Sequence, residues 1–240
     1  MAIKILNNDE HQAVKVDTRA SANYGDQVNR AVALSSEFND LHKEFPLLVH
    51  RGTDGGYTAH AILGLDRDEN LFVAGDRWIT ATMPASIARG PFSLGYVRGE
   101  DGEARPTDIK VMIDDQHPRL REEGIPVFLP LGGESSYLEG IKRVLQVVDA
   151  GLQTDRVLYP ELVSMGLLEE VSIEVTVHSD LKYGFNGYYT IGAEKLAGLG
   201  GDQLQRLNRL GLLAPIYFLI SSLGNFQRLI NLKNARGAAA

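Results

Sequence analysis

Apolar and polar positions follow two different periods along the chain. From 171 to 177 apolar and polar residues alternate, which is the two-residue period of a strand with one buried face. A second strand is predicted over 183–191, where the chain returns to form a hairpin. From Ser136 onward apolar residues recur every three or four positions, which predicts a long amphipathic helix. Ser136 and Glu139 have the spacing of a capping box at its start. The apolar positions of this helix are Leu138, Ile141, Leu145, Val148 and Leu152.

Short strands dominate the first half of the chain. The pattern predicts strands over 13–17, 47–49, 57–65, 109–113 and 127–129, with a polar loop over 99–107. One helix is expected between Ser35 or Ser36 and Glu44, ended by Pro46. Short strands with short connections favour antiparallel pairing.

The stretch 70–96 is predicted to form the middle of the core. It contains Trp78, the only tryptophan, and large apolar residues separated by glycine and proline. This arrangement is typical of two strands joined across a short helical turn.

The C-terminal part is predicted to be mainly helical. Pro160 should kink or restart the long helix, and Gly166 should end it. A short helix is expected from Asp202, capped with Gln205 and ended by Gly211, followed by a last helix with Pro215 in its first turn. The fold class is therefore α+β: an antiparallel sheet with amphipathic helices of the C-terminal half packed against it.

Length favours one domain over residues 1–240, with a boundary near Gly132 as the alternative and 237–240 as a disordered tail. The chain has no cysteine, which excludes disulfides, thiol catalysis and cysteine-bound metals.

A net charge of −7 argues against nucleic-acid binding. Neither a signal peptide nor a membrane-spanning apolar run is recognisable, so a cytoplasmic location is expected.

Basic residues are concentrated at the C-terminal end, where no carboxylate follows Asp202. Arg228, Lys233 and Arg236 are the candidate contact for an anionic membrane, a nucleic acid or the acidic face of a partner. Alternatively, these cations only favour the C-terminal end of a long helix.

No stretch matches a specific catalytic or cofactor motif, so no catalytic residue and no cofactor is predicted. The best metal-like pair is Asp115 and His117, which on an extended backbone could present an oxygen and a nitrogen ligand on one side. A third ligand would have to come from His50, His60 or His178. The alternative is ordinary turn chemistry.

Asp76, Arg77 and Trp78 combine charge with a flat ring at a turn, and Arg89 follows closely. Together they are the candidate binding site for a ligand or peptide. In the alternative, Trp78 fills the core and Arg89 pairs with an internal acid. The aromatic residues Tyr183, Phe185, Tyr188 and Tyr189 could line a pocket. In the alternative they pack in the core, because strands favour alternating aromatic residues.

The order of several motifs resembles the bacterial SapC family over nearly the whole chain. They are Tyr24-Gly25, 44–47, 70–72, Trp78, Pro84, Arg89-Gly90-Pro91-Phe92, 113–114, Pro118-Arg119, 166–169, 187–191 and the tail 216–234. The family name refers to a bacterial surface layer, and members resemble companions of outer-membrane uptake receptors and of halogenase- or oxygenase-like proteins. The resemblance implies no reaction and no functional residue.

Two hypotheses follow. The first is a non-enzymatic binding or assembly protein with a protein or peptide partner, linked to cell-surface or uptake systems. The second is a metal-dependent enzyme or enzyme accessory that acts on a small molecule or peptide. A location at the cell surface is the alternative that the family name implies.

Overall fold

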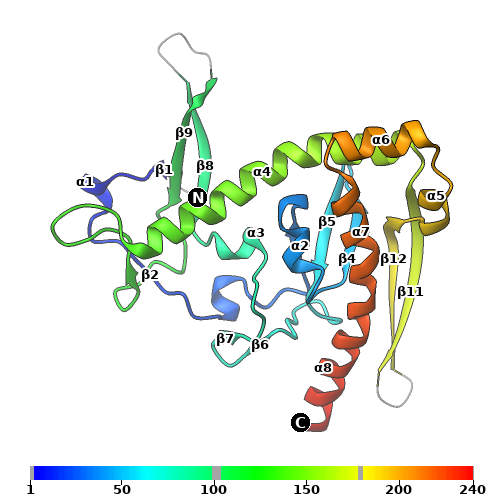
Figure 1. The fold of residues 1–240 in the computed structure, drawn as a ribbon. Coiled ribbons are helices and arrows are strands. Elements are labelled where there is room, and N and C mark those ends of the chain that lie inside the picture. Colours follow the sequence, from blue (N-terminus) through cyan, green and yellow to red (C-terminus); the bar gives the residue numbers. More distant parts are fainter. Residues whose placement is uncertain (1–2, 99–103, 178–180, 240) are drawn as a thin grey trace. The chain divides into compact units, whose positions relative to one another are not determined.

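The computed structural model describes residues 3–98, 104–177 and 181–239 (Figure 1). The side chains of residues 96–108 are not described. The chain forms two compact units, each described by itself. The first unit comprises Met1–Asp26, Gly75–Arg77 and Ala85–Asp149, and the second comprises Gln27–Ala74, Trp78–Pro84 and Ala150–Ala240. The prediction of one domain stays a prediction.

The first unit contains a three-stranded antiparallel sheet in the order β1-β9-β8. Its strands are β1 (Ile3–Ile5), β8 (Phe92–Arg98) and β9 (Ala104–Asp114). A second pair joins β2 (Lys15–Val16) to β10 (Ile125–Pro126). The unit also holds α1 (Asn8–His11), a 3-10 turn η1 (Ala22–Tyr24), α3 (Ala85–Ala88) and the start of α4 (Ser136–Ser164).

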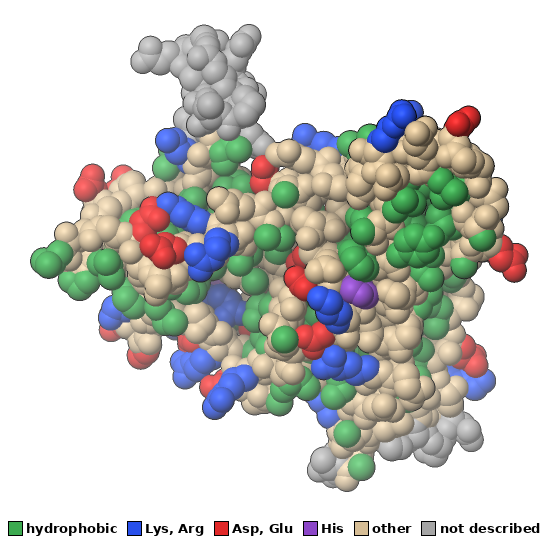
Figure 2. Space-filling view, in the orientation of Figure 1, with side chains coloured by type: hydrophobic (Ala, Val, Ile, Leu, Met, Phe, Trp, Pro, Cys, Tyr) green, Lys and Arg blue, Asp and Glu red, His purple; other side chains and the backbone are tan. Residues whose placement is uncertain are grey.

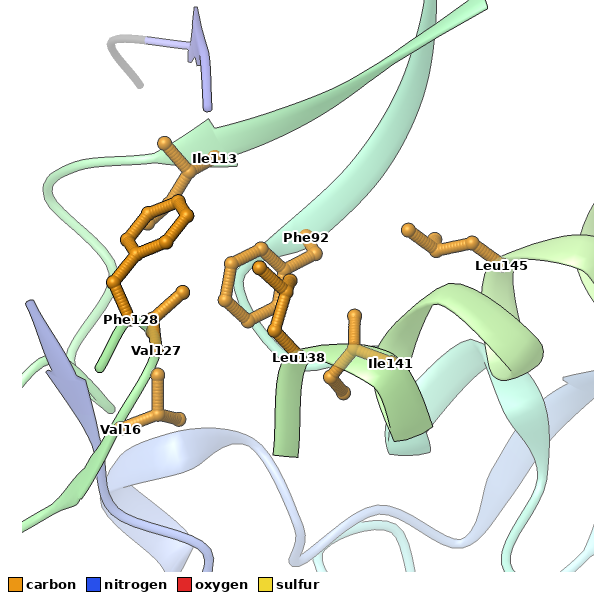
Figure 3. Close-up of a cluster of buried hydrophobic side chains, with 8 residues drawn as sticks. All are labelled: Val16, Phe92, Ile113, Val127, Phe128, Leu138, Ile141 and Leu145. Carbon is orange, nitrogen blue, oxygen red and sulfur yellow. The ribbon is translucent and has the colours of Figure 1, made fainter. Parts of the chain in front are cut away.

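The core of the first unit lies between this sheet and the first turns of α4 (Figure 3). Phe92 and Ile113 are paired across β8 and β9, and both are fully buried. The predicted helical spacing directs the side chains of α4 toward them. The cluster consists of Val16, Phe92, Ile113, Val127, Phe128, Leu138, Ile141 and Leu145.

The second unit is built on a five-stranded antiparallel sheet in the order β11-β12-β4-β5-β3. These strands are β3 (Arg30–Ala33), β4 (Leu47–Arg51), β5 (Tyr57–Ile62), β11 (Leu168–Val177) and β12 (Leu181–Ile191). The predicted hairpin is confirmed by the pairing of β11 with β12. Val175 and Val177 are buried while Glu174 and Thr176 are exposed, as the alternation requires.

The long helix α4 has 29 residues and runs from one unit into the other. Pro160 lies inside it, so the helix does not restart there; the kink, which was the other predicted outcome, stays a prediction. The predicted stop is right, because Gly166 adopts φ +64° and the Leu167 N–H donates to the Leu162 carbonyl at 2.9 Å. Leu152, which was predicted to lie on the apolar side of α4, is half exposed. Gly151 is buried instead, and because it has no side chain it leaves room for Leu34.

The remaining helices follow β12 in sequence. They are α5 (Ala193–Ala197), α6 (Gly201–Arg209), α7 (Leu213–Ser222), a 3-10 turn η3 (Leu223–Asn225) and α8 (Phe226–Ala239). The cap of α6 lies two residues earlier than predicted, since the Gln203 side chain accepts from the Gly200 N–H at 3.0 Å. Pro215 lies in the first turn of α7, as predicted. α8 continues to Ala239, where a disordered tail was expected; Ala240 lies outside the described residues.

The α+β prediction is confirmed. The predicted helix over 35–44 is a 3-10 turn η2 (Ser35–Glu37) followed by the single turn α2 (Phe38–Leu41). The stretch 70–96 is divided between the two units, so it is not the middle of one core. Its strands before the short helix, β6 (Val73–Ala74) and β7 (Arg77–Trp78), have two residues each. Of the predicted loop 99–107, residues 104–107 belong to β9 and 99–103 lie outside the described residues.

Candidate functional site

The first unit contains a pocket of about 540 Å³ beside the β1-β9-β8 sheet. This volume lies in the range of pockets that bind small molecules. The residues that line it come from the chain around α1, from β9, from the loop before α4 and from α4 itself. They are Leu6, Asn7, Asn8, Ile109, Lys110, Val111, Phe128, Gly133, Glu134, Leu138 and Lys142.

Backbone pairing fixes the walls of this pocket. The Leu6 N–H donates to the Val111 carbonyl at 2.9 Å, which extends the pairing of β1 with β9 by one residue. Asn7 then caps α1, because its Oδ1 accepts from the Glu10 N–H at 2.8 Å. The wall made by Phe128 and Leu138 belongs to the buried cluster of the first unit (Figure 3). The pocket therefore shares a wall with the core of the first unit.

One of the lining residues, Asn8, has a polar atom without a hydrogen-bond partner among the described residues. Asn8 Oδ1 is buried, and no described residue donates a hydrogen bond to it. A buried acceptor without a donor costs about 1–3 kcal/mol, so a ligand that supplies an N–H or O–H recovers this free energy. The exposed Lys110 and the ion pair of Lys142 with Glu134 add a net positive charge at the rim.

These features together define the ligand that the pocket suits. Leu6, Val111 and Leu138 offer apolar contact, the Asn8 amide offers an acceptor, and Lys110 offers a positive charge. The complementary ligand has an apolar body, a hydrogen-bond donor and an anionic end.

The predicted binding residues are not brought together in one unit. Asp76 and Arg77 belong to the first unit, where their charged groups lie 3.6 Å apart and both side chains are mostly exposed. Trp78 belongs to the second unit and is half-buried, and its indole nitrogen has no partner among the described residues. Arg89, in the first unit, donates to the Phe92 carbonyl at 2.7 Å. Its predicted role in ligand binding stays a prediction.

The predicted metal ligands already have partners within the first unit. The Asp115 carboxylate forms an ion pair with Lys4 at 2.7 Å. The Arg119 N–H donates to His117 Nδ1 at 3.1 Å, and burial together with the Arg119 charge lowers the pKa of His117. Among the described residues no group of three His, Asp or Glu side chains is arranged to hold a metal, and His178 lies outside them.

The three C-terminal cations contact groups of the second unit. Arg228 pairs with Glu44 at 3.0 Å and stacks on the Phe72 ring at 5.4 Å. Lys233 pairs with Asp66 and Glu69, and Arg236 donates to the Val73 carbonyl at 2.5 Å. On the face drawn in Figure 2, basic and acidic side chains are interspersed. These cations fasten α8 to the 66–73 segment; a contact with a partner stays a prediction.

Sequence reasoning missed a buried cluster around Arg119 in the first unit. The Arg119 guanidinium donates to both Asp26 carboxylate oxygens, at 2.7 and 2.8 Å, and to the carbonyls of Asp17 and Arg19. It also lies 5.0 Å from the centre of the Tyr24 ring. The cluster fixes the 17–26 loop. Pro118-Arg119 and Tyr24-Gly25 are among the motifs behind the family resemblance, and that was the available signal.

The comparison with protein families decides the relationship. Residues 6–229 match the SapC family. The chain belongs to the SapC family. No characterised protein and no solved structure shows a significant match to it. Within the described part of this SapC-family chain, no individual helix is long and apolar enough to cross a membrane; one bent pair, Gly201–Arg209 with Leu213–Ala238, meets that test jointly.

Proposed function

We propose that this SapC-family chain is a non-enzymatic binding protein whose first unit takes up an amphiphilic anion. The observation that carries the proposal is the 540 Å³ pocket, one of whose lining residues, Asn8, has a buried Oδ1 without a partner among the described residues. A ligand group that donates to Asn8 while its apolar body covers Val111 and Leu138 satisfies both features at once.

Two further observations support binding over catalysis. The titratable groups of the pocket are Lys110, Lys142 and Glu134, and the last two form an ion pair with each other. No nucleophile stands beside a general base among the lining residues. As part of the same proposal, the ligand or partner belongs to the cell-surface or outer-membrane uptake systems to which the family resemblance points.

The test uses 1-anilinonaphthalene-8-sulfonate, which combines an apolar ring system, an N–H donor and a sulfonate. Calorimetry and fluorescence titration of the folded chain should give one saturable site. Asn8→Ala removes the acceptor and should weaken binding by about 2–12-fold, the equivalent of one hydrogen bond. Val111→Trp should fill the pocket and abolish binding.

Matched controls separate the site from general stickiness. Lys110→Gln should weaken binding of the sulfonate, whereas Lys15→Gln, an exposed lysine of the same unit that does not line the pocket, should leave it unchanged. Thermal unfolding must show that each variant remains folded. Equal affinity in the wild type, Asn8→Ala and Val111→Trp would refute the proposal.

A further inference from the structure

Four polar side chains gather on one face of the five-stranded sheet in the second unit. Cross-strand pairing places Tyr188 opposite His50. His50 is also paired with Thr58, which lies two residues before His60 on β5, so His50 and His60 lie on the same face of the sheet. The His50 ring lies 5.9 Å from the His60 ring and 5.7 Å from the Tyr188 ring. Arg30, from β3, reaches across and donates to the Tyr188 hydroxyl at 2.7 Å.

Arg30 gives this group a positive charge. Arg30 forms no ion pair with any described carboxylate. Burial, together with the charges of Arg30 and His50, lowers the pKa of His60 to about 4. His60 Nδ1 is also buried without a hydrogen-bond partner among the described residues. In a chain of net charge −7, such a group is complementary to an anion.

We propose that Arg30, His50, His60 and Tyr188 form a second binding site, separate from the pocket, for an oxyanion group: a carboxylate or a phosphate. Arg30 uses one of its five N–H donors on Tyr188, and its side chain is exposed. Because the Tyr188 oxygen accepts that bond, its own O–H is free to donate to the anion. The two imidazoles add donors, and Phe185, 6.3 Å from the Tyr188 ring, adds an aromatic wall.

The test is an NMR titration of the 15N-histidine-labelled chain with inorganic phosphate, and separately with benzoate and phenyl phosphate. Binding should shift the His50 and His60 ring signals in a saturable way. It should also raise the pKa of His60, since a nearby anion favours the protonated imidazole. Tighter binding of the two aromatic anions than of inorganic phosphate would assign the natural source to an aromatic molecule; equal binding would assign it to a free small anion.

Neighbouring residues on the opposite face of the sheet provide matched controls. Tyr188→Phe and Arg30→Gln should each weaken phosphate binding by about tenfold or more, because each removes a bond to a charged group. Tyr189→Phe and Arg51→Gln should have no effect, since both side chains lie with Tyr57 on the other face. Unchanged His50 and His60 signals with all three anions, or equal losses in variants and controls, would overturn the proposal.

Discussion

Replacing Arg119 should destabilise the first unit more than any single surface substitution. Its side chain is 8% exposed, and the side chain of Asp26, with which it pairs, is fully buried. Arg119→Met would leave this carboxylate buried without its guanidinium partner, and would also remove the donors to the Asp17 and Arg19 carbonyls. Breaking a buried pair from one side costs about 3–5 kcal/mol. For a chain of this size that corresponds to a fall in Tm of about 6–20 °C.

Guanidinium unfolding followed by far-UV circular dichroism measures the loss. The double variant Asp26→Asn/Arg119→Met removes both charges and should recover part of the lost stability. Arg119→Lys should lie between the wild type and Arg119→Met, since an ammonium group cannot contact both carboxylate oxygens and two carbonyls in the same planar geometry. A change below about 1 kcal/mol for Arg119→Met, the size of a surface pair, would refute the reasoning.

Three other predictions concern stability. Lys233→Met should lower the free energy of unfolding in urea by about 1–2 kcal/mol, because Lys233 pairs with Asp66 and Glu69. The control Lys182→Met removes the exposed pair with Glu174 and should cost less than about 1 kcal/mol. Equal losses in the two variants would contradict the prediction. Gly124→Ala should cost about 1–3 kcal/mol, since the new Cβ would lie 2.5–2.7 Å from the Val16 backbone. Gly224→Ala, where the new Cβ has no neighbour within 4 Å, is the control and should cost less. Folding favours the neutral form of His60, so the free energy of unfolding in a phosphate-free buffer should fall as the pH drops from about 6.5 towards about 4. His60→Gln should reduce this pH dependence. Identical pH profiles for the wild type and His60→Gln would exclude the role of His60.

Local patterns predicted much of the fold. The alternation over 171–177 and the helical spacing from Leu138 identified β11 and α4 because both signals depend on neighbouring residues only. The predicted cap is wrong by one residue, since Ser135 Oγ accepts from the Leu138 N–H at 3.3 Å and Ser136 already belongs to the helix. Only the alternative of a restart at Pro160 is wrong: α4 continues through it, and burial of Leu158 and Leu162 offsets the one hydrogen bond that proline removes. The shift of the buried face at Leu152 depends on which unit α4 enters, and local periodicity carries no such information.

The candidate sites were harder to predict, because they join residues far apart in the sequence. The pocket brings together Asn8, Lys110 and Lys142 only because β1 pairs with β9 and α4 lies beside them. His50 and His60 were noted only as spare metal ligands, yet strand register places them beside Tyr188. The Asp76, Arg77 and Trp78 run was predicted to act together because it is contiguous, but its residues belong to two units.

The binding pocket is the central claim, and its most direct test is an amide NMR map of the chain titrated with 1-anilinonaphthalene-8-sulfonate. The account predicts saturable shifts concentrated in the four segments that line the pocket, namely 6–8, 109–111, 128–134 and 138–142. Shifts that gather elsewhere, or that spread evenly over both units, would contradict it.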